Sequence, residues 1–172
     1  FRAAEVADVI GTTENAVTSA LKRARGALAR EWPGPGRESA PLPDSPRERR
    51  ILDGFVRAFE SGDVDAVVAL LTDDAWLSMP PLPLEYHGVD AVRYFLATVS
   101  LGHGHRHVLV PTRANGQPAF GCYLRDPRTP ILRAHGVLVL TLAGDRISTL
   151  TRFLDNSLLT RFGLPRSLRE RV

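Results

Sequence analysis

"FVRAFESGDVDAVVALLTDDAWLSMPP", residues 55–81, contains the signals that decide the fold. Gly62 can take the left-handed conformation that ends a helix, and Asp63 can cap a following helix over residues 64–74. Residues 75–79 then predict a short strand, which two prolines stop. The helix before Gly62 is predicted from apolar residues at helical spacing, namely Ile51, Leu52, Phe55, Val56 and Phe59.

The C-terminal half predicts a third helix, over residues 89–99, followed by an antiparallel meander. Asn115-Gly116 favours a tight hairpin because both residues tolerate positive φ, and residues 143–145 predict a second hairpin. Strand-like runs flank these turns, at residues 106–113, 117–125, 131–142 and 146–154. The predicted fold class is therefore α+β, a curved antiparallel sheet with three helices packed on one face.

The chain is predicted to have three regions. Residues 1–32 are helical, residues 33–50 form a linker, and residues 51–172 form the α+β domain. The linker is predicted from its five prolines, Pro33, Pro35, Pro41, Pro43 and Pro46. Because proline disrupts regular helix, the linker should be extended and semi-rigid.

The N-terminal region has the pattern of a helix-turn-helix. Ala7 is small enough for two helices to cross there, and Gly11 can take the left-handed turn between them. Thr12 or Thr13 should cap the second helix. The apolar residues expected between the helices are Ile10, Val17 and Leu21. The alternative is a plain amphipathic helical hairpin with a solvated basic face.

The outward side of the second helix suits DNA. Hydroxyl and amide groups come first and cations follow, an order that fits base edges and then phosphates. These outward residues are Glu14, Asn15, Thr18, Ser19, Lys22, Arg23 and Arg25. Residues 14–31 hold four basic and two acidic side chains, a net charge of +2, whereas residues 51–172 hold 13 arginines against 12 acids. Any affinity for nucleic acid is therefore expected at the N-terminal end.

Composition excludes several other classes of protein. The 172 residues carry 22 basic and 19 acidic side chains, a net charge of +3, and Cys122 is the only cysteine. One cysteine allows neither an internal disulfide nor a zinc site built on cysteines. The longest apolar run is too short to span a bilayer, and no signal-peptide pattern opens the chain, so we expect a cytoplasmic protein and interpret the start at Phe1 as a cut.

Three histidines alternate in "HGHRH", at positions 103, 105 and 107. On a strand they would share one face and could bind a metal. The segment follows a helix and contains Gly102 and Gly104, which favours a loop, and no carboxylate lies nearby in the sequence. We therefore predict no metal site and no cofactor.

Two parts of the sequence resemble one family. "AAEVADVIGTTENAVTSALKRARGALARE", residues 3–31, resembles the end of region 4 of the extracytoplasmic-function (ECF) sigma factors of bacterial RNA polymerase, most specifically in "SALKRAR". The stretches "EYHGVDAVRYFL", "PTRANGQPAF" and "STLTRFLD" resemble the SnoaL-like C-terminal domain of some of these factors, the sigma-G-like and sigma-J-like groups. The resemblance covers essentially the whole chain.

This resemblance implies a function in transcription initiation. Region 4 of the family binds the minus-35 promoter element and core RNA polymerase, and the positions implied to face DNA here are Thr13, Glu14, Asn15, Thr18, Ser19, Lys22, Arg23 and Arg25. Region 2 and the first helices of region 4 have no counterpart, so the chain is expected to be the C-terminal part of such a factor. The SnoaL-like domain would regulate it by contacting the sigma regions or the linker, and could bind a small ligand.

The resemblance also implies a cone-shaped domain that encloses a pocket. Acid–base chemistry there would need an inward carboxylate or histidine, and the predicted strands contain no Asp or Glu. We therefore predict no catalytic residue. The candidates for lining the pocket are Trp76, Met79, Tyr86, Phe120 and His135. Strict alternation places His135 opposite the more apolar face of Leu132, Leu138 and Leu140, so it should point away from the core, half-buried against a neighbour.

Two further hypotheses remain open from the sequence. The α+β domain could be an enzyme of the cyclase or isomerase type, or a ligand-binding module, with N-terminal helices that merely pack or dimerise. It could also be a pure dimerisation module, which predicts an exposed apolar face on the sheet.

Overall fold

The computed structural model describes four stretches of the chain: residues 2–31, 39–102, 106–126 and 128–169. Contacts within the chain divide it into two compact units, Phe1–Arg37 and Glu38–Val172. Each unit is described by itself. Within the four stretches, no helix combines the length and the apolar character that a membrane span requires.

The first unit consists of α1 (Ala3–Ile10) and α2 (Glu14–Glu31). Gly11 lies between them with φ of 67°, and its N–H donates a hydrogen bond to the carbonyl of Ala7. Thr13 caps α2, because its hydroxyl accepts a hydrogen bond from a backbone N–H of the first turn at 3.2 Å. The predicted left-handed turn and the cap are both confirmed.

The contact between α1 and α2 is smaller than the sequence predicts. Ala7 and Val17 are buried between the helices, as expected. Ile10 and Leu21 were expected there too, and this is wrong, because their exposed fractions are 63% and 47%. Two helices can cover only one line of contact, so the rest of an apolar stripe stays uncovered.

The second unit begins its secondary structure earlier than predicted. Helix α3 runs over Pro46–Ser61, so the last five residues of the predicted linker, 46–50, are helical. Pro46 occupies the first helical turn, where the missing N–H costs no hydrogen bond and the fixed φ suits a helix. The Ser45 hydroxyl caps this turn by accepting from the N–H of Glu48 at 3.2 Å. Pro46 therefore starts a helix, and the prediction that it belongs to an extended linker is wrong.

Helix α3 buries the predicted apolar stripe and ends where expected. Gly62 is left-handed at φ of 75°, and Asp63 caps α4 (Val64–Ala69) by accepting from the N–H of Ala66 at 2.9 Å. The predicted continuation of this helix to residue 74 is wrong, because β1 (Leu71–Ser78) has already begun. Pairing of Leu71 with β6 overrides the local helical pattern.

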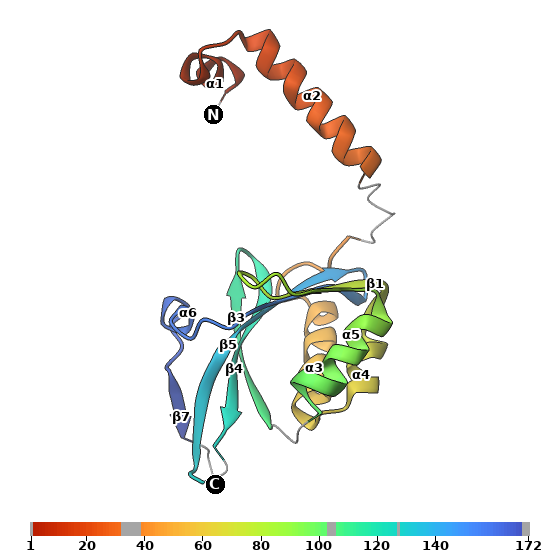
Figure 1. Cartoon of the computed structure of the whole chain (residues 1–172), viewed down its shortest axis with the longest axis vertical. Helices are drawn as coiled ribbons and strands as arrows, with labels where there is room; N and C mark the ends of the chain where they lie inside the picture. Colours follow the sequence, from red (N-terminus) through yellow and green to blue (C-terminus); the bar gives the residue numbers. More distant parts are fainter. Residues whose placement is uncertain (1, 32–38, 103–105, 127, 170–172) are drawn as a thin grey trace. The chain divides into compact units, whose positions relative to one another are not determined.

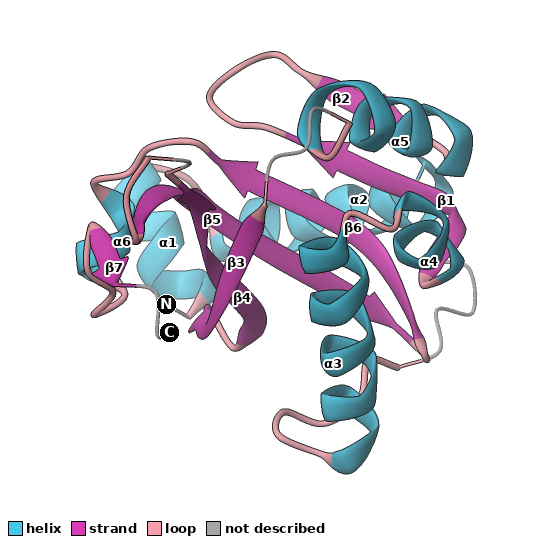
Figure 2. Ribbon diagram, turned by 90° about the horizontal axis from the view of Figure 1, so that it is seen from below, coloured by secondary structure: helices cyan, strands magenta, loops and turns pink. Residues whose placement is uncertain are grey.

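The described residues form a sheet of seven strands, in the order β2-β1-β6-β5-β4-β3, with β7 also paired to β5. The remaining strands are β2 (Glu85–His87), β3 (His107–Ala114), β4 (Gln117–Arg125), β5 (Ile131–Ala143), β6 (Arg146–Phe153) and β7 (Ser167–Arg169). Asn115 and Gly116 form the β3–β4 turn at positive φ, which confirms that hairpin. The expectation of a purely antiparallel sheet is wrong, because β1 runs parallel to β6 (Figure 2).

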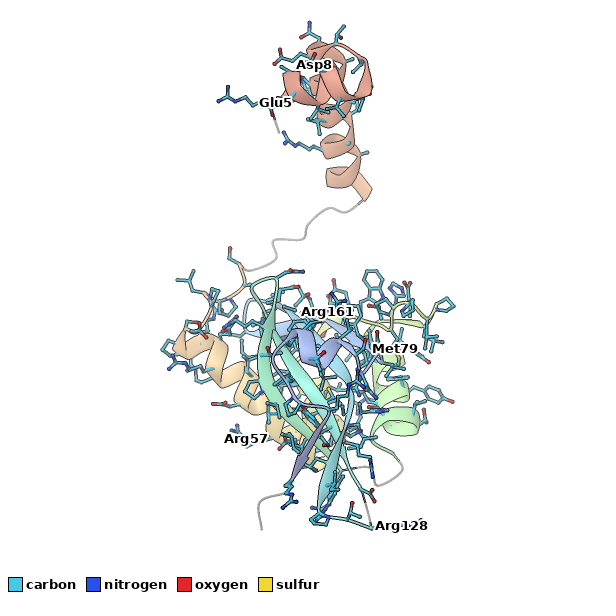
Figure 3. The ribbon with its side chains drawn as sticks, turned by 90° about the vertical axis from the view of Figure 1, so that its left-hand side faces the viewer. Glu5, Asp8, Arg57, Met79, Arg128 and Arg161 are labelled. Carbon is cyan, nitrogen blue, oxygen red and sulfur yellow. The ribbon has the colours of Figure 1, made fainter. Side chains whose placement is uncertain are left out.

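Helices cover both faces of the curved sheet unequally. Figure 1 shows α3, α4 and α5 (Val89–Phe95) along one face, which we call the inner face, and α6 (Leu158–Arg161) near the other, the outer face. The inner face carries the main core, with Phe55 and Val92 of the helices against Phe120 and Leu140 of the sheet. Arg57 lies on the exposed side of α3 (Figure 3). The predicted α+β fold class with three helices on one face is confirmed.

Two features at the ends of elements were not predicted. Helix α5 continues as one turn of π-helix, η1 (Leu96–Ser100). A short strand, β7, follows α6 and pairs with β5. Tyr123 ties this segment down, since its hydroxyl donates to the carbonyl of Pro165 at 2.7 Å.

Candidate functional site: an apolar cavity with one buried arginine

A cavity of about 300 Å³ lies between the inner face of the sheet and the helices. Ten of its fourteen lining residues are apolar, namely Phe59, Leu77, Met79, Phe95, Leu96, Val99, Leu124, Leu138, Leu150 and Leu154. The four polar ones are Ser100, His107, His135 and Arg152. Its size lies at the lower end of the range of about 300–1,000 Å³ that is typical of small-molecule sites.

A bulge in β5 decides which side chains reach the cavity. Ala134 pairs with Tyr123, whereas Val137 pairs with Gly121, so four residues of β5 oppose three of β4. Gly136 makes this possible with φ of 88°, and a Cβ there would lie 2.0 Å from the carbonyl oxygen of Phe153. Such an extra residue reverses the alternation of side chains beyond it.

The bulge corrects the predicted orientation of His135. Leu132 and Val137 both pack in the outer cluster, while Leu138 and Leu140 pack in the inner core. His135 was expected to point away from that core, and this is wrong, because it lines the cavity together with Leu138. Alternation counted from the sequence fails across an inserted residue.

Two imidazoles share the polar side of the cavity. The His107 and His135 rings have centroids 6.3 Å apart, and Nε2 of His107 lies 3.0 Å from the carbonyl oxygen of Ser100. His107 also packs edge-on against Phe59, with centroids 5.2 Å apart. It is 4% exposed although it is the first residue of β3.

Arg152 is the one cation among the lining residues, and it is 8% exposed. Its Nη2 donates to the carbonyl oxygen of His135 at 2.6 Å, and its Nη1 lies 3.0 Å from Sγ of Cys122. Within the described part of the chain, no carboxylate forms an ion pair with it. Arg152 was not among the predicted site residues, although its alternation with Leu150 and Leu154 already places it on an apolar face.

The thiol beside Arg152 is neutral. Burial raises the pKa of Cys122 above the usual value of a thiol, and the nearby guanidinium only partly opposes this effect. A buried thiol with a raised pKa accepts hydrogen bonds weakly and reacts slowly. Cys122 therefore does not neutralise the charge of Arg152.

Only two of the five predicted lining residues reach the cavity, Met79 and His135. Met79, labelled in Figure 3, directly follows β1. The prediction is wrong for the other three. Trp76 stacks on His87 of β2 with centroids 5.0 Å apart, Tyr86 packs on Phe95 at 4.8 Å, and Phe120 packs on Phe55 at 6.1 Å. Each of these rings is held by an aromatic neighbour in the core or at the sheet edge.

Of the three alternating histidines, His107 is the one that lies within the described residues. His103 and His105 lie outside the described residues. His107 begins β3 and points into the cavity. Across the ranges that the structure describes, no three His, Cys, Asp or Glu side chains come together as a metal site.

The first unit presents a polar, basic face. Every residue predicted to face DNA is exposed, namely Thr13, Glu14, Asn15, Thr18, Ser19, Lys22, Arg23 and Arg25. Val17, on the opposite side of α2, is buried against α1. The Thr18 hydroxyl donates to the carbonyl of Glu14 at 2.7 Å, so it is partly engaged by its own helix.

A curved sheet wrapped by helices around an apolar cavity defines the α+β fold of nuclear-transport-factor-like proteins. Residues 52–149 match the family model of the SnoaL-like domain, and the chain belongs to this family.

Comparisons with solved structures agree on the fold. An NTF2-like protein of unknown function from Burkholderia xenovorans has a TM-score of 0.50 and 15% identity, covering 63% of this chain and 83% of that one. An LEH-like epoxide hydrolase of Mycobacterium tuberculosis has a TM-score of 0.51 and 18% identity, covering 69% of this chain and 90% of that one.

One similarity extends over both units. The chain is 38% identical over 171 residues to the ECF RNA polymerase sigma factor SigG of Mycobacterium tuberculosis, a match that covers 98% of this chain. The chain spans only 45% of the length of that relative.

Proposed function

We propose that the chain is the C-terminal part of an ECF sigma factor, in which the first unit binds the minus-35 promoter element and the SnoaL-like domain regulates the activity. The observation that carries this proposal is the similarity to SigG over 98% of the chain, because it includes both units and the segment between them. Core RNA polymerase and promoter DNA are then the partners, and the protein works in the cytoplasm.

The exposed side of α2 supports promoter binding. Polar side chains such as Asn15 occupy its first turn, and Lys22, Arg23 and Arg25 follow. A recognition helix contacts bases with its N-terminal residues, and cations further along neutralise phosphates. Apolar side chains at Ile10 and Leu21 remain 63% and 47% exposed, and the helices that complete region 4 would cover them.

Regulation is assigned to the SnoaL-like domain because its cavity can respond to a small molecule. A ligand that binds one state of the domain more tightly shifts the population toward that state. In this proposal the domain contacts the sigma regions or the linker, and the ligand alters that contact. The domain itself catalyses no reaction.

Run-off transcription tests the proposal. The full-length parent protein with matched core polymerase is compared with a version that lacks residues 45–172, a cut placed before the cap of α3. We expect the deletion to change the amount of transcript at equal protein concentration. An unchanged transcript yield would contradict a regulatory role for the domain.

Promoter contacts are tested separately with Lys22→Ala and Arg23→Ala in the full-length parent. Each should weaken promoter binding and reduce the slope of log affinity against log salt by about 1, because one phosphate contact is lost. Arg57→Ala, exposed on α3, is the matched control and should leave the slope unchanged. Equal slopes for all the proteins would contradict DNA binding by α2.

A second candidate function is an enzyme that uses the two imidazoles. His107 and His135 face the same cavity, and the LEH-like epoxide hydrolase shares the fold. A histidine can transfer protons near neutral pH. Under this alternative, His135→Gln would abolish turnover of a substrate, while removal of the domain would leave transcription unchanged.

A further inference from the structure

We propose that the cavity binds an apolar molecule carrying a single carboxylate, and that Arg152 binds this carboxylate. This inference names the class of ligand for the regulatory domain of the proposed function. It is tested by binding alone, so its failure and the failure of the transcriptional proposal are distinguishable.

The charge of Arg152 is the first argument. Arg152 is 8% exposed, and the two hydrogen-bond acceptors of its guanidinium, the His135 carbonyl and the Cys122 thiol, are both neutral. A buried charge is costly unless an opposite charge pairs with it, and no carboxylate in the described ranges does so. An anionic ligand would supply the missing charge.

The free hydrogen-bonding capacity of Arg152 is the second argument. A guanidinium has five N–H groups in a planar fork, and the described residues accept two hydrogen bonds from this one. Because that fork matches the two oxygens of a carboxylate, a bidentate contact is the strongest use of the remaining donors. A phosphate would bring a second negative charge, and the described residues that line the cavity include no second arginine or lysine to meet it.

The side chains that line the cavity determine the chemistry of the rest of the ligand. Phe95, Leu96, Leu138 and Leu150 surround the space beyond Arg152, so the body of the ligand must be apolar. Val99 and Leu154 line the cavity and are also 56% and 39% exposed, which places them at its opening. A ligand enters between η1 and the residues that follow β6.

Isothermal titration calorimetry on the whole chain tests the proposal with two probe carboxylates, naphthalene-2-carboxylate and decanoate. Their neutral analogues are 2-naphthalenemethanol and decanol, and naphthylmethylammonium has the opposite charge. We expect at least one carboxylate to bind about tenfold or more tightly than its alcohol, as a charge-assisted hydrogen bond provides. Failure of both carboxylates to saturate, or equal binding of the alcohol or the ammonium, would overturn the proposal.

Substitutions test whether Arg152 is the residue that binds the carboxylate. Arg152→Met keeps an unbranched stem and removes the charge and the N–H donors, so the preference for the carboxylate should disappear. Arg146→Met is the matched control on the same strand, because Arg146 lies outside the cavity with a side chain that is 54% exposed. Retained preference in Arg152→Met would show that another site binds the probe.

A measurement on the unchanged protein covers the case in which Arg152→Met does not fold. Amide chemical shifts in a titration with the bound carboxylate should move in η1, β5 and β6 around the cavity. Shifts confined to other elements would overturn the proposal independently of any variant.

Discussion

The Arg152 guanidinium lies against the Cys122 thiol, with Nη1 3.0 Å from Sγ, on the inner face of the sheet. A cation normally favours a thiolate, yet burial dominates here and raises the pKa of Cys122. The pair therefore consists of a charged arginine and a neutral thiol.

Cys122 should consequently react slowly in the folded protein. With Ellman's reagent near pH 8, we expect the native thiol to react at least about a hundred times more slowly than in denaturant, since it is buried and a smaller fraction is thiolate. Free cysteine under both conditions is the control for the reagent. A native rate close to the denatured rate would show that Cys122 is accessible.

Gly136→Ala should destabilise the second unit severely. The added Cβ would lie 2.0 Å from the carbonyl oxygen of Phe153 at φ of 88°, so the β5–β6 pairing must shift, at a cost of more than about 3 kcal/mol. Gly116→Ala is the matched control at φ of 80° with no atom within 4 Å, and should cost about 1–2 kcal/mol. Urea unfolding measures the free energy of unfolding of both variants. Equal decreases for Gly136→Ala and Gly116→Ala would contradict a special role for the bulge.

Glu48→Gln should weaken the start of α3. Glu48 is 2% exposed, pairs with Arg113 and accepts from the N–H of Asp44 at 2.7 Å. Loss of its charge should lower the free energy of unfolding by about 1.5–3 kcal/mol, the value typical of hydrogen bonds to charged groups. Asp145→Asn breaks the exposed ion pair with Arg47 and should cost less. The prediction would be wrong if Asp145→Asn lowered the free energy of unfolding more than Glu48→Gln does.

Acid should destabilise the second unit partly through Asp155. Hydrogen bonds from the hydroxyl and the N–H of Ser157 hold the pKa of Asp155 below its usual value of 3.8. A lowered folded pKa means that this stabilisation is present above the unfolded pKa and is lost as the pH falls through the folded one. The drop in Tm between about pH 6 and about pH 2 should therefore be smaller in Asp155→Asn and intermediate in Ser157→Ala. An unchanged drop in Asp155→Asn would contradict this assignment.

Local signals in the sequence predicted where several helices begin or end and where one hairpin turns. Gly62 and Asp63 end one helix and start the next, and Asn115-Gly116 forms the β3–β4 turn. These positions depend on backbone geometry that one or two residues determine by themselves. The same reasoning identified the left-handed turn at Gly11.

The end of an element could not be predicted from local sequence where it depends on pairing with a distant segment. The end of α4 was misplaced because Leu71 pairs with Ile147 of β6, 76 positions later in the chain. His135 was assigned to the wrong face because strict alternation was assumed across Gly136, although an isolated glycine within a strand is a local signal for a bulge. Arg152 did have a local signal, since it alternates with Leu150 and Leu154 on an apolar face, but the prediction considered only carboxylates and histidines as polar groups of the pocket. The choice among aromatic residues failed for a similar reason, since Trp76 and Tyr86 pack against partners from other elements.

The parallel pairing of β1 with β6 has a consequence for the order of events on the ribosome. β1 and the three helices of the second unit are synthesised before β6, the parallel partner of β1, which begins only at Arg146. Domains fold as units during synthesis, and pairings between distant segments form late. The cavity, whose walls run from Phe59 to Leu154, therefore forms only when almost the whole chain has emerged. A ligand of this cavity can therefore bind only after β6 has emerged and paired with β1.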